Sequence, residues 1–236
     1  MMKKQLSILL MSCALCCFNA LIGQDSIVIS STVDYDYLED QFYFGVAYNA
    51  LTNRPNDIIQ RNFSYNIQAG FIKDIPINAK RNFGFGLGVG YATNSYYSDI
   101  IAEETETGFN YRRAVSSDSI ARSKFETHGI EFPFEIRWRT SNAVNYKFWR
   151  VYTGVKAAYL FSRRSKFVSE NNSLNTSFNN TDIAQWQYGL TLSVGYNTWN
   201  MYLYYGLNSL LDENALLEEQ VIEIQSLQIG LVFYFL

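Results

Sequence analysis

Five charged residues fall at even spacings in two neighbouring segments, and they are the residues best suited to chemistry. The first segment contributes Glu131, Glu135 and Arg137, and the second contributes Arg150 and Lys156. Even spacing places the members of each segment on one face of a β-strand. Such a face could carry protons or ions through the interior of a sheet protein, or clamp a charged substrate. Alternatively the charges pair and fill that interior, which we favour because unpaired buried charges are costly.

Histidine chemistry rests on a single residue, His128, with Glu126 and Thr127 beside it. A histidine next to an acid would suit an esterase or acyltransferase. No serine lies at a fixed spacing from it, so we expect a polar surface residue and no catalytic site. One histidine and three cysteines are too few for a zinc or haem cluster. We therefore expect no enzyme activity, no cofactor and no metal.

The elements that carry these residues are strands, because eight segments alternate with period two. Aromatic residues make up 17% of the chain, which also favours β structure. The clearest segment is 83–92, where every odd residue is large and apolar and every even one is Gly or Ala. The other seven are residues 42–49, 63–71, 130–138, 149–161, 186–197, 199–208 and 226–235.

A stripe of glycines occupies the even positions of segment 83–92. The stripe could leave a cavity for a ligand. We expect instead that it makes room for bulky side chains from other strands. The stripe residues are Gly84, Gly86, Gly88 and Gly90, and the candidates to fill the space are Tyr202, Tyr204, Tyr234 and the arginines.

The connections between the segments distinguish a membrane barrel from a soluble sandwich. They alternate regularly between long and short, as in an outer-membrane barrel with both ends of the chain in the periplasm. The last segment, which ends Phe233-Tyr234-Phe235-Leu236, is aromatic without a polar tail, as closing strands of such barrels often are. The long connections are residues 50–62, 94–124, 162–185 and 209–225, and the short ones are residues 73–82, 139–148 and 197–198.

All four tryptophans lie on apolar faces close to strand ends. Indole rings favour the headgroup level of a bilayer, so these residues are candidate membrane-interface anchors. They are Trp138, Trp149, Trp186 and Trp199. The sequence therefore predicts an all-β fold: an eight-stranded antiparallel transmembrane β-barrel of the outer membrane with up-and-down meander topology, spanning residues 41–236.

The first residues have the pattern of a secretory signal peptide. Met1-Met2-Lys3-Lys4 precedes an apolar run from Leu6 to Phe18 and then small residues. We expect cleavage after Gly23, so that residues 1–23 are the signal peptide and residues 24–40 an acidic periplasmic leader. A lipoprotein is the alternative, since Cys13 follows a loose lipobox. We expect the protein in the outer membrane of a Gram-negative bacterium.

The charge balance limits the partners. A formal charge of −3 gives no basic surface for nucleic acid, so we expect none bound. Arg163, Arg164 and Lys166 at the outer rim could meet lipopolysaccharide phosphates, or could simply be solvated. Expected partners are therefore outer-membrane lipid, with lipopolysaccharide as a candidate, and other outer-membrane or periplasmic proteins of a secretion or assembly complex.

Five stretches of the chain together have a familiar pattern. They are residues 41–46, 51–55, 134–141, 146–154 and 188–200. These stretches resemble the PorT-like family of outer-membrane β-barrels from Bacteroidota. The resemblance covers most of the chain from Gln41 onward and is weakest in the two longest connections. It implies an eight-stranded barrel associated with type IX protein secretion, and it brings no catalytic residues.

Four hypotheses for the function follow. The first is a non-enzymatic accessory or assembly component of a secretion apparatus. The second is a subunit attached to the outer-membrane protein insertion machinery. The third is a small channel or ligand-binding barrel, which a charged and tyrosine-rich interior disfavours. The last is a lipid-modifying enzyme built on His128.

Overall fold

The structure is a computed structural model that describes residues 40–55, 58–60, 62–115, 118, 120–140, 148–170 and 175–235. All of them belong to one compact unit, Tyr35–Leu236. The expected signal peptide, residues 1–23, and all but the last residue of the expected leader lie outside the described residues. Within the described ranges, no helix is both long and apolar enough to cross a bilayer.

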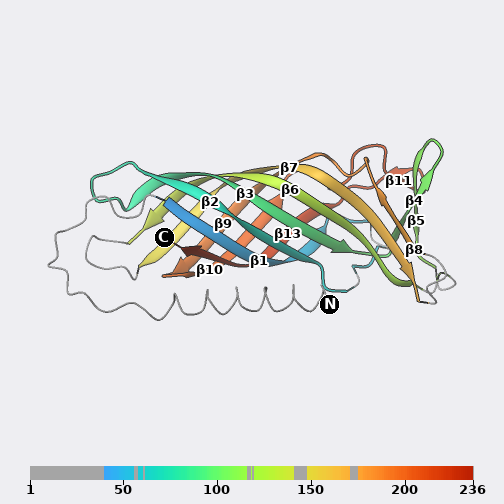
Figure 1. The fold of residues 1–236 in the computed structure, drawn as a ribbon, viewed down its shortest axis with the longest axis horizontal. Helices are drawn as coiled ribbons and strands as arrows, with labels where there is room; N and C mark the ends of the chain where they lie inside the picture. The colour runs from blue at the N-terminus through green and yellow to red at the C-terminus, as the bar shows by residue number, and fades with distance from the viewer. Residues whose placement is uncertain are drawn as a thin grey trace, which may run out of the picture. The chain divides into compact units, whose positions relative to one another are not determined.

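Eight strands form a closed antiparallel barrel, which confirms the fold expected from the alternation (Figure 1). They follow one another around the barrel in chain order, and the last strand pairs with the first, so the topology is an up-and-down meander. The strands are β1 (Asp40–Thr52), β2 (Tyr65–Pro76), β3 (Phe83–Tyr97), β6 (Ile120–Arg139), β7 (Trp149–Ser169), β9 (Trp186–Tyr196), β10 (Trp199–Gly206) and β13 (Gln225–Phe235).

Burial in these strands is the reverse of that in a soluble sandwich. Leu190, Leu192 and Val194 of β9 are exposed on the outer wall, whereas Thr191 and Ser193 between them are buried inside. The same inversion recurs around the barrel, because each strand turns its apolar face outward. An apolar exterior around a polar interior is the arrangement of a barrel that stands in lipid.

One end of the barrel, here called the turn end, has short connections. Residues 77–82 join β2 to β3, and Asn197 with Thr198 joins β9 to β10. Asn197 has a φ of 56°, a left-handed conformation that asparagine tolerates in tight hairpins. The described chain also begins and ends here, since Phe42 of β1 pairs with Phe235 of β13.

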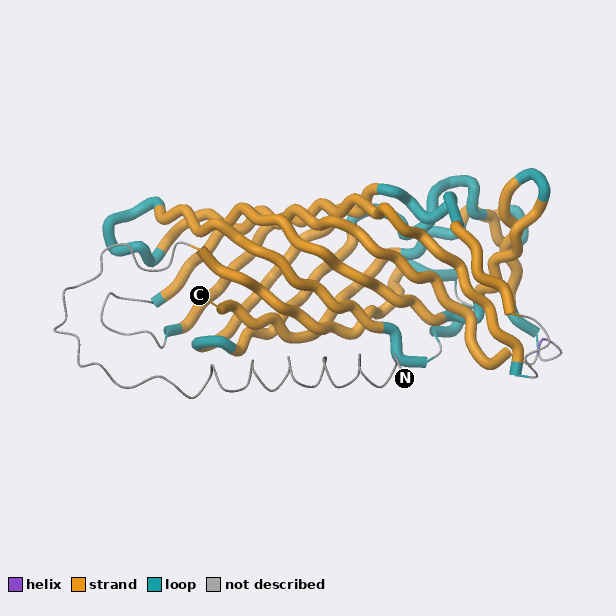
Figure 2. The backbone as a smooth tube through the Cα atoms, in the orientation of Figure 1, coloured by secondary structure: helices purple, strands orange, loops and turns teal. Residues whose placement is uncertain are grey.

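The opposite end, here called the loop end, holds more regular structure than the sequence indicated. β6 and β7 run to 20 and 21 residues, about twice the 9–11 residues that cross a bilayer. They extend into the expected loops 94–124 and 162–185 over residues 120–124 and 162–169 (Figure 2). The shorter strands at this end are β4 (Ile100–Thr105), β5 (Gly108–Arg113), β8 (Asn175–Asn179), β11 (Leu216–Leu217) and β12 (Gln220–Val221).

The connections at the loop end pack around an apolar core, which we call the cap. The sequence showed no periodic segment in the long connections and gave no sign of this core. Their apolar side chains are too scattered along the chain to show a period, yet they meet in space. The cap core comprises Leu51, Ile58, Tyr96, Ile100, Ala102, Tyr111, Phe125, Leu160, Ile183, Leu210, Leu211, Ala215, Ile222 and Ile224.

Candidate functional site

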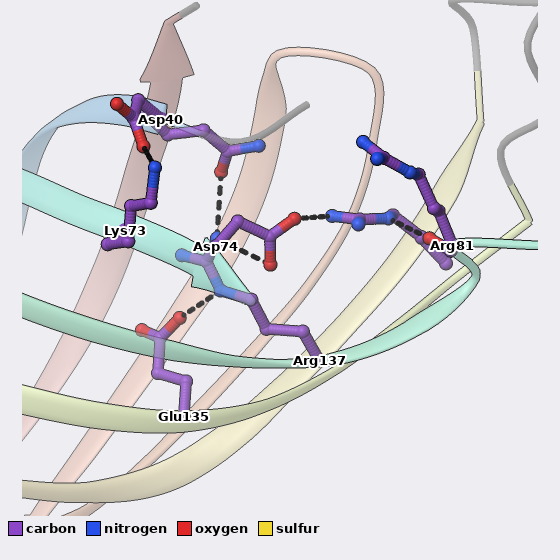
Figure 3. A network of polar contacts seen from close by, with 8 residues as sticks. Asp40, Lys73, Asp74, Arg81, Glu135 and Arg137 are labelled. Atoms are coloured by element: carbon purple, nitrogen blue, oxygen red, sulfur yellow. Dashed lines mark hydrogen bonds and ion pairs between the residues drawn. The ribbon is translucent and has the colours of Figure 1, made fainter. Parts of the chain in front are cut away.

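A cluster of buried charges fills the lumen near the turn end (Figure 3). Asp74 of β2 forms ion pairs with two arginines. Its Oδ2 accepts a hydrogen bond from Arg139, and its Oδ1 lies 3.6 Å from Nη1 of Arg137. Arg137 also donates from Nε to Oε2 of Glu135 at 3.0 Å and from Nη1 to the side-chain oxygen of Gln41 at 3.1 Å. Two carboxylates thus pair with two guanidinium groups away from water.

A second cluster lies further along the lumen and centres on Lys156 of β7. Its ammonium group contacts Oε2 of Glu131, Oε1 of Gln68 and the hydroxyl of Tyr202, each at 2.9 Å. These three acceptors match the three protons of the ammonium group. Tyr43 donates to the other oxygen of Glu131 at 2.8 Å. The pair is therefore fully hydrogen-bonded within the barrel.

Arg150 is the exception among the five charged residues that the sequence singled out. No ion pair joins it to a described residue, and its Nε and Nη1 atoms have no hydrogen-bond partner there. Its guanidinium carbon lies 4.6 Å from the ring centre of Phe148, 5.6 Å from that of Tyr234 and 5.8 Å from that of Tyr152. Aromatic faces attract a cation in this way, so Arg150 is held by rings rather than by a carboxylate.

Neighbouring side chains occupy the space beside the glycine stripe of β3, residues 84–90. A Cβ atom at Gly86 would lie 2.5 Å from Nε of Arg137, and one at Gly90 would collide with the hydroxyl of Tyr43. An arginine therefore packs against the stripe, as expected. The tyrosine that does so is Tyr43, which the sequence did not suggest; the candidates had been Tyr202, Tyr204 and Tyr234.

Between the Lys156 cluster and the cap lies a cavity of about 30 Å³. Its walls include Glu131 and Lys156 from the lumen and Tyr96 and Leu210 from the cap core. A space of this size holds about one water molecule. Eight strands enclose just enough room for side chains to fill, and the described lumen is filled in this way.

A known protein family agrees with this architecture. Residues 24–212 match the model of a family described as outer membrane protein beta-barrel domain. The chain belongs to this family. Among solved structures, it is similar to Ail, the attachment invasion locus protein of Yersinia pestis, at 12% sequence identity and a TM-score of 0.34, over 84% of this chain and 98% of that chain. No curated protein matches the chain.

Membership in the outer membrane protein beta-barrel domain family indicates the outer membrane as the location. Bacterial barrels of this kind keep short turns in the periplasm and longer loops outside. By this rule we expect the turn end to face the periplasm and the cap to face the exterior, which stays a prediction. The four tryptophans are exposed on the outer wall, where Trp199 packs on Phe233 at 4.9 Å between ring centres and Trp186 on Tyr159 at 5.1 Å. Their role as interface anchors stays a prediction.

His128 of this barrel uses both ring nitrogens within the outer wall. Its Nδ1 lies 2.6 Å from the hydroxyl of Tyr91, and its Nε2 lies 3.4 Å from Oε1 of Glu126. Thr127 points into the barrel and is buried. Ser162 is the cross-strand neighbour of His128, but neither nitrogen is left to activate its hydroxyl. The geometry gives no support to a serine–histidine catalytic pair.

Two residues central to the lumen network were missed from the sequence. Ile72 and Arg137 point inward. Asp74 lies two residues after Ile72, and Arg139 lies two residues after Arg137. Continuing the alternation past the end of each expected segment would have placed both inside. The pairing itself could not be predicted, because it depends on the register between β2, β3 and β6.

Replacing Glu135 with alanine tests whether the lumen network is structural. Arg137 would lose one of its two carboxylate partners, so we expect a loss of about 1–3 kcal/mol in the free energy of unfolding. The remaining side chains still fill the lumen, so conductance in planar bilayers should stay at the level of the native protein. An increase in conductance would contradict a structural role and favour an ion path.

Proposed function

We propose that the protein is a non-enzymatic, non-conducting outer-membrane barrel that serves as an accessory or assembly component of a protein secretion apparatus. The observation that carries the proposal is the filled lumen. Lys156 of β7 and Glu131 of the neighbouring strand β6 are paired inside it at 2.9 Å, beside a cavity of only about 30 Å³. A barrel with no passage along its axis acts through its outer wall and its two ends, and those are surfaces for contact with other molecules.

The cap gives such a protein a defined surface beyond the membrane. Tyr111 donates to Oδ2 of Asp182 at 3.1 Å and accepts from Nδ2 of Asn180 at 2.8 Å, which ties β5 to the connection before β9. Burial raises the pKa of Asp182, although the hydrogen bond from Tyr111 acts against that rise. A surface that is already folded binds a partner without the entropy cost of ordering long loops.

The resemblance to the PorT-like family makes a type IX-like apparatus the first system to test. The resemblance supports the choice of partner only, because it assigns no residue to a secretion mechanism. Attachment to the outer-membrane protein insertion machinery is the main alternative and uses the same surfaces. A channel would need a wider lumen, and a lipid-modifying enzyme would need a free nitrogen on His128.

Deleting the gene should block secretion if the proposal is right. We expect cargo of the type IX system to accumulate in the periplasm and to fall in the culture medium, with recovery when the native gene is restored. Complementation with the Glu135→Ala variant is the matched control, since it changes the lumen and leaves the surfaces intact. Normal secretion in the deletion strain would contradict the proposal.

Purification of the tagged protein in a mild detergent separates the two protein-binding hypotheses. A tag in the exposed turn between β4 and β5 avoids both the barrel wall and the cap core. Recovery of secretion components would favour the proposed role. Recovery of the insertion machinery alone, at a constant ratio and in a strain with intact secretion, would favour the alternative.

A further inference from the structure

A β-bulge redirects the charged side chains of β7 where the strand leaves the barrel. The pairing of β6 with β7 shifts register between His128 and Gly129, whose partners are Ser162 and Leu160. Bulges of this kind turn the following residues onto the other face. Odd-numbered residues of β7 point outward before the shift, and even-numbered residues do so after it.

The bulge therefore separates the two arginines that follow it. Arg163 now points inward, where Nη1 donates to the carbonyl oxygens of Thr181 at 3.0 Å and Ile183 at 2.6 Å. These bonds tie Arg163 to the connection before β9 and hold it away from Arg164 and Lys166. Arg164 and Lys166 share the outward face with the even-numbered residues of β6.

The outward face of the extended β6–β7 pair is a cationic surface. Lys124 lies directly opposite Lys166, and Glu126 lies opposite Arg164. Glu126 contacts Lys124 and His128. Arg164 and Lys166 form no ion pair with any described residue. We call this surface the cationic strip; its residues are Arg122, Lys124, Glu126, His128, Arg164 and Lys166, four permanent cations against one carboxylate.

Like charges that face each other across a strand pair destabilise a sheet. Lys124 and Lys166 are in that position; Glu126 offsets the charge of Lys124, and a bound anion would offset that of Lys166. The neighbouring strand β8 presents polar side chains beside the strip, since Ser177 pairs with Lys166 and Asn179 with Arg164. Hydroxyl and amide groups next to cations suit a ligand that combines phosphate with sugar.

Aromatic rings mark the membrane surface just below the strip. Tyr91 stacks on His128 at 6.1 Å and on Phe161 at 6.3 Å between ring centres, and both Tyr91 and Phe161 are exposed on the outer wall. Lys124 lies four residues before His128 on β6, which is about 13 Å nearer the loop end at the usual rise of a strand. The strip therefore lies at headgroup height above an aromatic girdle.

We infer that the cationic strip binds the phosphate groups of an outer-leaflet glycolipid, lipopolysaccharide, through its lipid A part. The phosphates lie against Arg164 and Lys166, beside the Lys124–Glu126 pair, and the acyl chains follow the apolar wall below, past Tyr91 and Phe161. A free phosphate would gain nothing from that wall. This site is independent of the proposed secretion role, because it needs only the barrel and its extension.

The test uses the full-length protein purified in detergent and lipid A that carries both phosphates. Each cation near an anionic membrane surface contributes roughly a fivefold factor to binding, so the Arg164→Gln/Lys166→Gln variant should bind about 30-fold more weakly. Lys73→Gln/Lys80→Gln removes two cations at the turn end and is the matched control, with unchanged binding expected. Retained heat-modifiable migration on gels verifies that both variants are folded.

Further measurements identify the source of the phosphate. Lipid A stripped of its phosphates should bind the native protein as weakly as intact lipid A binds the strip variant. Inorganic phosphate at millimolar concentration should not displace intact lipid A. Equal binding of intact lipid A by the native protein and the strip variant, or displacement by inorganic phosphate, would overturn the inference.

Discussion

Replacing Asp74 with alanine is expected to lower the free energy of unfolding by about 3–5 kcal/mol, because the change leaves buried guanidinium charge without its partner. Asp74 is the carboxylate that two arginines share: Arg139 contacts Oδ2, and Arg137 lies 3.6 Å from Oδ1. The side chains of Asp74 and Arg137 are fully buried. Unfolding in denaturant from lipid vesicles, followed by tryptophan fluorescence, would measure the loss.

Asp40 provides the matched control for this change. It lies on β1 and pairs at 2.9 Å with Lys73, the residue before Asp74 on β2, but the two side chains are 51% and 50% exposed. Exposed pairs of this kind contribute about 1 kcal/mol or less, so Asp40→Ala should be nearly neutral. Equal losses for the two variants would show that burial does not set the energy of these pairs.

A double variant distinguishes lost pairing from a lost hydrogen-bond acceptor. Adding Arg139→Met to Asp74→Ala removes the guanidinium group that the single variant strands, while Arg137 keeps Glu135 and Gln41. We expect the double variant to be more stable than the single one, since an apolar side chain costs less inside than an unpaired charge. A further loss equal to that of Arg139→Met alone would contradict this account.

Alternation carries most of what the sequence could predict about this fold. A strand with one face in lipid and one in the lumen must place apolar residues at every second position. That constraint fixed the eight strands, the inward position of Glu131 and Lys156, and the outward position of the tryptophans. It could not pair Glu131 with Lys156, because that contact depends on the register between the neighbouring strands β6 and β7 and on side-chain reach.

The cap could not be predicted for a different physical reason. Its core takes isolated residues such as Ile58, Ile183 and Ile222 from separate connections, and none belongs to a periodic segment. Burial there follows from contacts between distant parts of the chain, which no local pattern encodes. No sequence pattern predicts the bulge beside His128 either, yet the bulge makes Arg164 rather than Arg163 face outward.

Replacing Ile222 with alanine is expected to open the cap while the barrel stays folded. Ile222 is fully buried in the cap core, and truncation of a buried isoleucine to alanine costs about 2–5 kcal/mol. Its amide donates to the carbonyl of Ala215 at 2.9 Å, so the hairpin of β11 and β12 depends on the same contact. Hydrogen exchange of that amide should accelerate by at least about 30-fold, since 1.4 kcal/mol corresponds to a factor of ten.

The neighbouring residue Val221 gives the control, because it is 43% exposed and its side chain lies outside the cap core. Val221→Ala should leave exchange in residues 210–224 unchanged, and neither variant should alter heat-modifiable migration of the barrel. Loss of barrel folding in Ile222→Ala would show that cap and barrel form one cooperative unit.

If the barrel of Ile222→Ala stays folded, the same two variants also locate the surface that binds the partner. A partner that binds the folded cap is lost with Ile222→Ala and kept with Val221→Ala, whereas one that binds the outer wall is kept with both.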